Sequence, residues 1–450
     1  MNLGPSLILC LLLLAPAVFG QPTYSKEVSR IIQQKCQTCH RPNDVAPFAL
    51  LTYDDAANWA PDIERVVTSR RMPPWKPIDD HAKFKGYRGL SDEQRQTLID
   101  WVRAGAPEGD PADLPEPLDL TSQWTLGQPD LELQMAESYA PPRGKDMYRC
   151  FVLPTGLTAN QFISAIDVQP GRRSIVHHVI LYLDTTGDAE KLDAADDGPG
   201  YTCFGGPGTG LSAGNGNLPS LSLSSLLEIG ANLGGWAPGQ RPEKLPDGTA
   251  MYLDQNARIV MQVHYYSTRQ SGEDQTRVGL YFSQAPVERR LIWMPVVPLD
   301  NRSRLSMKIP AGAKGFDVKA EFSIPPISLF DLTAVAVYPH MHLLGTAIKL
   351  EVERPRESPE QMIAIDNWDF NWQGPYQYNE PVKVPAGSKV RLTCTYDNSV
   401  DNPRNPAVSP RDISWGEGTE DEMCLAFVGI TFDHENLLPL NQLSVGRLKK

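Results

Sequence analysis

Residues 332–342, LTAVAVYPHMH, combine an apolar strand-like pattern with two histidines. Its small and β-branched residues are typical of a strand, and successive side chains of a strand point to opposite faces. One face is therefore expected to carry Leu332, Ala334, Ala336, Tyr338, His340 and His342. The stretch predicts a buried strand that presents two histidines on the same side.

Similar short runs continue on both sides of this strand. Gly, Pro, Asp and Asn separate them through 129–450, and Val260, Gln262 and His264 alternate in the same way. This pattern is typical of an antiparallel all-β architecture. A break near 286–298 divides the region into halves, which we predict as 129–287 and 288–450.

The amino-terminal part has a different pattern. Residues 21–112 contain helical stripes, one of which follows a Ser91–Gln94 pair that suits a capping box and ends at Gly105. We predict a small helical domain here. Residues 113–128 are rich in proline and acidic residues without a sustained period, so they are predicted to form a linker.

Charge and length limit the function. The 42 basic and 54 acidic residues give a net charge of -12, and no Lys/Arg stripe is present. Nucleic acid is therefore not an expected partner. A chain of 450 residues is expected to form several domains.

An apolar run at 7–14 is followed by small residues before Gln21. This arrangement predicts a signal peptide over 1–20, although the segment lacks Lys and Arg, so an uncleaved anchor stays an alternative. We expect a secreted protein of the bacterial periplasm. In that compartment Cys150, Cys203, Cys394 and Cys424 form an even set, which indicates two disulfides.

Cys36-Gln37-Thr38-Cys39-His40 has the spacing that attaches haem covalently. Two thiols bind the haem and the adjacent imidazole ligates the iron, which gives one covalently bound haem c with Cys36, Cys39 and His40. A redox dithiol and half of a zinc site are the alternatives. A dithiol would not require His40, and zinc would need a second pair of ligands nearby.

Met72, within Arg71-Met72-Pro73-Pro74-Trp75, is the predicted sixth ligand of the haem iron. A core methionine is the alternative interpretation of Met72, and His81 is an alternative ligand. With these residues in place, 21–112 resembles class I cytochromes c, and thioether ligation in that group raises the iron potential.

Histidines and a methionine recur later in the chain. Each histidine alone is more often a packed or surface residue, but the set suits copper, because Cu(I) accepts imidazole with thioether and Cu(II) accepts several imidazoles. We predict two copper ions. The candidate ligands are His177, His178 and His264 for one ion, and His340, His342 and Met423 for the other.

The ordered motifs resemble the copper type II, ascorbate-dependent monooxygenases, which include peptidylglycine alpha-hydroxylating and dopamine beta-monooxygenases. The resemblance covers 129–450. The motifs are Val176-His177-His178, Gln262-Val263-His264-Tyr265, His340-Met341-His342-Leu343-Leu344-Gly345 and Asp421-Glu422-Met423-Cys424.

The resemblance implies two all-β sandwiches with jelly-roll character, each holding one copper, that face each other across a cleft. The whole fold class is then multidomain, with a small all-α cytochrome c domain followed by these two sandwiches. The resemblance also implies disulfides Cys150–Cys203 and Cys394–Cys424.

The resemblance divides the chemistry between the two metal centres. The three-histidine copper would store an electron, and His340, His342 and Met423 would be the catalytic residues at the copper that binds O2. Tyr338 and Phe427 stand where the peptide-amidating enzyme has an arginine and a tyrosine that hold a peptide carboxylate. A small organic substrate other than a glycine-extended peptide is therefore expected.

The leading hypothesis is an exported monooxygenase that hydroxylates a C–H bond with O2. Its electrons would come through the fused haem from a periplasmic donor or an ascorbate-like reductant. A non-catalytic copper-binding or electron-transfer protein is the alternative, and an electron-delivery subunit of a larger complex is another.

Overall fold

The computed structural model describes residues 20–42, 44–78, 83–119, 124–144, 146–203, 206–209, 232–266, 272–301, 304–326, 331–416 and 418–433. The predicted signal segment, apart from Gly20, and His81 lie outside these residues. Within them, we find no helix that is both long and apolar enough to cross a membrane.

Contacts divide the chain into two units. Unit 1 comprises Met1–Gln37, Leu50–Pro73 and Gly89–Leu118; unit 2 comprises Thr38–Ala49, Pro74–Arg88 and Asp119–Lys450.

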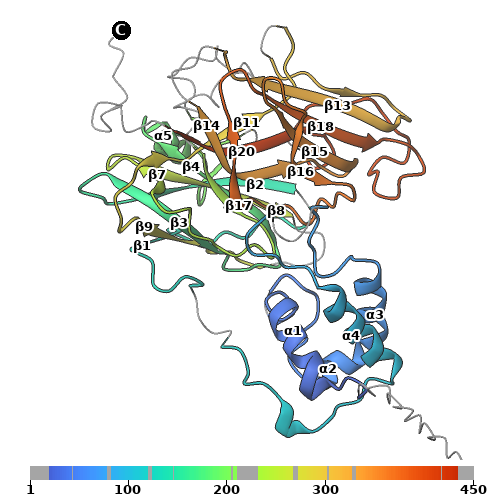
Figure 1. Ribbon diagram of the computed structural model, residues 1–450. Helices are drawn as coiled ribbons and strands as arrows, with labels where there is room; N and C mark the ends of the chain where they lie inside the picture. The colour runs from blue at the N-terminus through green and yellow to red at the C-terminus, as the bar shows by residue number, and fades with distance from the viewer. Residues whose placement is uncertain are drawn as a thin grey trace, which may run out of the picture. The chain divides into compact units, whose positions relative to one another are not determined.

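Unit 1 is helical (Figure 1). Its elements are η1 (Tyr24–Val28), α1 (Ser29–Lys35), α2 (Tyr53–Asn58), α3 (Ala60–Thr68), α4 (Asp92–Arg103) and η2 (Pro111–Asp113). The capping box at α4 is confirmed, because the Ser91 hydroxyl accepts from the Gln94 backbone N–H and the Gln94 side chain accepts from the Ser91 N–H, each at 3.1 Å. Leu98 and Trp101 on the same helix are buried.

The described residues of unit 2 form four sheets of four or five strands and one small strand pair. Sheet A has the order β1 (Leu131–Gln134), β9 (Arg277–Phe282), β3 (Gln161–Gln169), β7 (Thr249–Leu253) and β10 (Arg289–Arg290). Sheet B has the order β5 (Tyr201–Thr202), β2 (Asp146–Pro154), β8 (Arg258–Tyr266), β4 (Val176–Asp184) and β6 (Asn232–Trp236).

The other two sheets come from the carboxy-terminal half. Sheet C has the order β11 (Ile292–Val296), β20 (Leu425–Phe432), β14 (Leu332–His340) and β17 (Tyr376–Val384). Sheet D has the order β13 (Lys314–Ser323), β18 (Lys389–Asp397), β15 (Gly345–Glu353) and β16 (Glu360–Ile365), and the strand pair is β12 (Lys308–Ile309) with β19 (Ile413–Ser414).

Sheet C has apolar residues on both faces. Val337 packs into a core shared with sheet D, whereas Trp293 and Ala336 pack into the core between sheets A and B. This explains why the strands of sheet C read as nearly continuous apolar runs, as strands buried on both faces do.

The predicted fold class is wrong. Strands make up 37 % of the described residues and helices 14 %, and the described β region consists of four sheets in which sheet C contributes to two cores, instead of two separate jelly-roll-like sandwiches. A small all-α cytochrome c domain is also not found in the described part of the chain. Thr38–Ala49 and Pro74–Arg88, which the prediction gave to that domain, belong to the β unit.

The segment Pro74–Arg88 joins the β unit because its backbone and aromatic groups find partners there. Phe84 forms a β-bridge with Tyr378, and its ring lies 5.1 Å from the Tyr378 ring. The Lys85 N–H donates to the Gln377 carbonyl at 2.8 Å. An extended segment with such partners behaves as an added edge strand rather than as part of a helical bundle.

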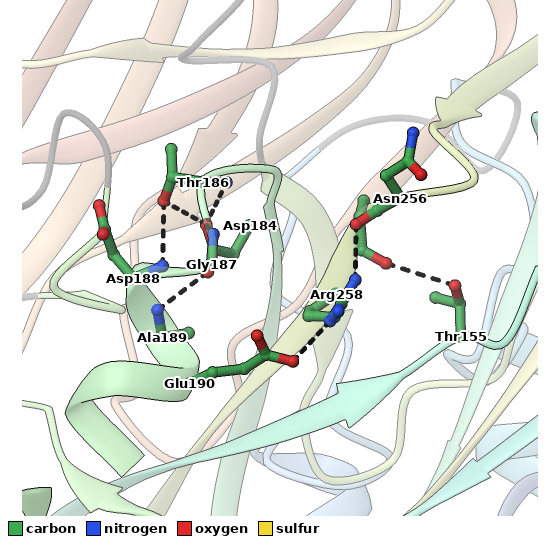
Figure 2. Close-up of polar contacts among 10 residues, drawn as sticks. Thr155, Asp184, Thr186, Gly187, Asp188, Ala189, Glu190, Asn256 and Arg258 are labelled. Carbon is green, nitrogen blue, oxygen red and sulfur yellow. Dashed lines mark hydrogen bonds and ion pairs between the residues drawn. The ribbon is translucent and has the colours of Figure 1, made fainter. Parts of the chain in front are cut away.

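Helix α5 (Asp188–Ala195) follows β4, and polar contacts join it to the end of β4 and the start of β8 (Figure 2). The Asp184 carboxylate accepts from the Thr186 N–H and hydroxyl at 2.8 and 2.6 Å and from the Ala189 N–H at 2.9 Å. Arg258 at the start of β8 donates to Glu190 at 2.7 Å. These contacts fix β4 and β8 at the ends opposite to those that carry the first set of histidines.

Candidate metal centres

His177 and His178 are adjacent on β4, where a regular strand would direct them to opposite faces. The pairing of β4 with β8 is irregular at this point: Val176 pairs with Tyr265, and His178 pairs with His264. The extra residue, His177, forms a β-bulge, which redirects a side chain locally. The bulge therefore allows both adjacent histidines to approach His264 from one side.

The three imidazoles converge. Their candidate ligand nitrogens all lie within 4.8 Å of one another, and all three side chains are buried. The two Nδ1 atoms of His177 and His178 are 3.1 Å apart. Two nitrogens each about 2.0–2.1 Å from one ion, at an angle near tetrahedral, lie roughly 3 Å apart, so the pair fits a shared metal.

Burial and neighbouring imidazoles favour the neutral form of His177 and His178. Burial, together with the neighbouring His264, lowers the pKa of His177 and of His178 well below the ordinary value. Their ring nitrogens thus keep lone pairs for a cation at neutral pH. The Asp146 carboxylate accepts from Nε2 of His264, which places a proton on Nε2 and makes Nδ1 the ligand atom.

The second set begins at the end of β14, where a second bulge corrects the predicted pattern. The register shifts between Ala334 and Ala336. As a result Leu332 and Ala334 pack into the sheet C–D core, whereas Ala336 packs into the sheet A–B core. The strand therefore does not keep one face from 332 to 342, and His340 follows the face of Ala336.

His340 and His342 face each other through Nε2, and these two atoms are 3.2 Å apart. Each Nδ1 is held by another group: Gln373 Oε1 accepts from His340, and the Asp421 carbonyl accepts from His342 at 3.0 Å. Protons on both Nδ1 atoms leave two Nε2 lone pairs at a separation that fits one ion.

These two imidazoles are also neutral. Burial, with the neighbouring His342, lowers the pKa of His340 to about 3, and burial lowers the pKa of His342 to about 4. A soft or borderline cation is suited to such a pair when a thioether completes the set.

Met423 lies in the segment that holds His342. Glu422 is fully buried and accepts from the backbone N–H groups of His342 and Leu344 at 2.9 and 2.6 Å. The Tyr396 hydroxyl donates to the Met423 carbonyl at 2.7 Å. Two side chains therefore fix the backbone on both sides of the methionine.

The two sets of histidines are close together. The rings of His178 and His340 have centroids 6.5 Å apart. Phe370 stacks on His177 at 4.5 Å and lies 5.8 Å from His342 in an edge-to-face arrangement. The sequence predicted two centres facing across a cleft, and the structure places an aromatic ring against a histidine of each.

Both predicted disulfides are confirmed, Cys150–Cys203 and Cys394–Cys424. The first lies beside Gln262, whose side chain donates to the Cys203 carbonyl at 2.9 Å. Gln262 thus acts as a structural amide. The second joins β18 to the residue that follows Met423.

At the haem-attachment motif, Cys36 and Cys39 are half-buried thiols. His40 Nδ1 contacts the Phe48 carbonyl at 3.2 Å, so a proton on Nδ1 leaves Nε2 as the ligand atom. This chemistry fits an axial iron ligand. Met72 is half-buried and follows α3, and its N–H donates to the Val66 carbonyl at 3.2 Å.

Sequence reasoning missed four residues that orient the histidines: Asp146, Phe370, Gln373 and Glu422. Glu422 could have been suspected, because an acidic residue inside an apolar motif needs a partner when buried. No local pattern reveals the other three, whose roles depend on contacts between distant segments.

Comparison with known proteins supports the second set most directly. Residues 303–434 match the family model of the copper type II ascorbate-dependent monooxygenases, in its C-terminal domain. His340, His342 and Met423 lie inside this match. The chain is also 23 % identical over 274 residues to the human DBH-like monooxygenase protein 1, a match that covers 58 % of this chain and 40 % of that protein.

Solved structures add no argument. The major capsid protein P2 of bacteriophage PM2 is 9 % identical with a TM-score of 0.23, covering 67 % of this chain and 96 % of that chain. The cowpea mosaic virus top component is 8 % identical with a TM-score of 0.28, covering 70 % and 94 %. The proposed function therefore draws on the match of residues 303–434 to the C-terminal domain of that family.

Proposed function

We propose that this protein is an exported, copper-dependent monooxygenase that hydroxylates a C–H bond of a small organic substrate with O2. The observation that supports the proposal is the pair of converging imidazole sets, with ring nitrogens 3.1 and 3.2 Å apart. His177, His178 and His264 would hold one copper ion, and His340, His342 and Met423 would hold the other. Bound copper would supply one-electron redox chemistry and O2 binding.

The chain's own residues have three tasks in this proposal. Asp146, Gln373 and the Asp421 carbonyl fix the proton on each imidazole they contact, which keeps the opposite nitrogen available for the metal. Phe370 covers His177 with an apolar ring and limits the access of water. Glu422 holds the backbone on both sides of His342.

The proposed substrate has no carboxylate group that needs a cationic side chain to bind it. Tyr338 and Phe427 are paired across β14 and β20, and both pack against the sheet A–B core. An aromatic pair here offers an apolar surface in place of a cation. This favours an apolar or weakly polar organic molecule.

We also propose a covalently bound haem c at Cys36 and Cys39, with His40 and Met72 as axial ligands. The sequence motif and the orientation of His40 support it. The haem would carry single electrons from a periplasmic donor or an ascorbate-like reductant. A visible spectrum of protein matured with haem tests this part separately: covalent haem should be lost when Cys36 and Cys39 are both changed to Ala.

The experiment that tests the main proposal supplies copper-loaded protein with ascorbate, ¹⁸O2 and a set of small organic molecules. One labelled oxygen atom is expected in a product. The Met423→Leu variant keeps the side-chain volume and removes the thioether, so turnover should collapse. Met251→Leu, a buried methionine of sheet A, is the matched control and should retain turnover. Two bound copper ions without labelled product would instead favour the non-catalytic copper or electron-transfer protein.

A further inference from the structure

Asp146 belongs to neither set of candidate ligands, yet it contacts both regions. It is the first residue of β2 and lies beside β8 in sheet B. One carboxylate oxygen accepts from His264 Nε2. The other oxygen accepts from the Thr419 hydroxyl, and from the Thr419 N–H at 3.2 Å.

Thr419 lies on the other half of unit 2, in the segment that supports the second set. It is buried, with 6 % of its surface exposed. Two residues later, the Asp421 N–H donates to the Gly418 carbonyl at 2.8 Å, which closes the turn around Thr419. The Asp421 carbonyl then accepts from His342 Nδ1 at 3.0 Å. A single short segment therefore connects the Asp146 carboxylate to His342.

A second contact crosses between the halves in the opposite direction. Phe370, which follows β16, stacks on His177 of sheet B with an interplanar angle of 21°. The Phe370 carbonyl accepts from Gln373 Nε2 at 2.8 Å, and Gln373 Oε1 accepts from His340 Nδ1. Thus Asp146 of the first half contacts the segment that supports His342, and Phe370 of the second half stacks on His177.

We propose that the Asp146–Thr419 contact couples the two metal centres, so that the copper affinity of each set depends on the support of the other. This inference rests on the proposed function, because it requires copper at both sets. Its physical basis is that the Asp146 carboxylate accepts hydrogen bonds from both His264 and Thr419. When Thr419 no longer donates, Asp146 can rotate, and the proton and orientation of His264 are no longer fixed.

The test measures Cu(I) affinity at the three-histidine set by competition with a chromophoric Cu(I) chelator. The background is Met423→Leu, which removes the thioether from the second set and leaves the three-histidine set as the stronger site. Adding Thr419→Val to this background removes the hydroxyl that donates to Asp146. Loss of a direct partner of a metal ligand weakens metal binding by about 10–100-fold. Thr419 acts on His264 through Asp146, so a decrease at the lower end of that range, about tenfold, is expected.

Two variants make the result specific. Thr419→Ser retains the hydroxyl and should stay within about twofold of the background, since the hydrogen bond is kept. Thr395→Val removes an equivalent Thr–Asp bond, from Thr395 to Asp317 at 2.7 Å on sheet D, and should leave the affinity unchanged. If circular dichroism shows that the Thr419→Val variant is not folded, Thr419→Ala replaces it in the same measurement.

Equal Cu(I) affinity in Thr419→Val and Thr395→Val would overturn the coupling. A background protein that binds no copper would instead overturn the proposed function, so the two failures are distinguishable. The reciprocal measurement uses Asp146→Asn in the otherwise unchanged protein. X-ray absorption should then show a reduced sulfur contribution to the Cu(I) coordination shell, because the support of His342 and Met423 is weakened.

Discussion

The two candidate metal centres are built in different ways. His177, His178 and His264 all come from paired strands of one sheet, and a β-bulge brings them together. His340 and His342 stand at and beyond the end of β14, and side-chain and carbonyl groups from separate loops hold their Nδ1 atoms. Backbone pairing between two strands therefore fixes the first set, whereas contacts with residues of separate loops fix the second.

The largest loss of copper affinity should come from removing a ligand of the three-histidine set, which strand pairing holds. His178→Ala is expected to remove one of the two copper equivalents, with a loss of Cu(I) affinity of about 100-fold or more at that set, which exceeds the usual effect of an outer partner. Competitive chelator titration measures it. Retention of two tight equivalents would show that His178 is not a ligand.

The two halves also differ in their disulfides, which close loops of 53 and 30 residues. Removing either pair by double Cys→Ala substitution should lower the free energy of unfolding by roughly 3–4 kcal/mol, since both loops are long. Denaturant unfolding monitored by fluorescence measures this.

The two substitutions should differ in function, however. Cys394–Cys424 adjoins Met423, so its loss should reduce oxygen-dependent turnover of the folded protein, whereas loss of Cys150–Cys203 should not. Equal turnover in the two folded variants would contradict the dependence of the second set on its loops.

Glu422 tests the same dependence on a smaller scale. In Glu422→Leu the backbone N–H groups of His342 and Leu344, which now donate to the buried Glu422 side chain, would both lose their acceptor. A buried donor without an acceptor costs about 1–3 kcal/mol. Denaturant unfolding at pH 6 should show that loss. Asp317→Asn, at an exposed site on sheet D, is the control and should have little effect.

The pH dependence of stability has a defined sign at this residue. Burial raises the pKa of Glu422 from 4.5 to about 8. The folded state therefore holds a proton that the unfolded state releases, so this stabilising contribution is complete below pH 4.5 and is lost as the pH rises through 8. The free energy of unfolding of the metal-free protein should decrease more between pH 5 and 8 than that of Glu422→Gln. Parallel pH profiles would contradict the assignment.

The smallest effect is expected for copper binding in mild acid. Because the pKa values of His340 and His342 are lowered to about 3 and about 4, protons do not compete with copper until the pH approaches 4. Cu(I) affinity at the second set should therefore change by less than about threefold between pH 7 and pH 5.5, whereas exposed imidazoles would already be protonated. A tenfold decrease over that range would contradict the neutral, buried state of these ligands.

The sequence predicted the local features of the molecule well and its long-range pairings poorly. The helix Asp92–Arg103 follows from the Ser91–Gln94 box and an apolar stripe, and the strands around His264 and His340 follow from alternation. These features depend on neighbouring residues. The bulge in β14 depends on the partner strands, so the predicted faces failed after Ala334.

The same reason explains the errors about larger features. The Phe84–Tyr378 bridge joins residues almost 300 positions apart and places Pro74–Arg88 with the β-sheets, which no helical pattern could indicate. Asp146 and Thr419 are also distant in sequence, so their shared hydrogen bonds left no local signal. The candidate ligands could be found because metal ligands must be of particular chemical types, whereas the residues that orient them need not be.

Titration of the protein with Cu(I), followed by X-ray absorption, would show whether two unlike copper centres lie side by side. We expect saturation at two equivalents, with a sulfur scatterer present in the unchanged protein and in Met251→Leu and absent in Met423→Leu. Saturation at one equivalent, or an unchanged sulfur contribution in Met423→Leu, would contradict the account.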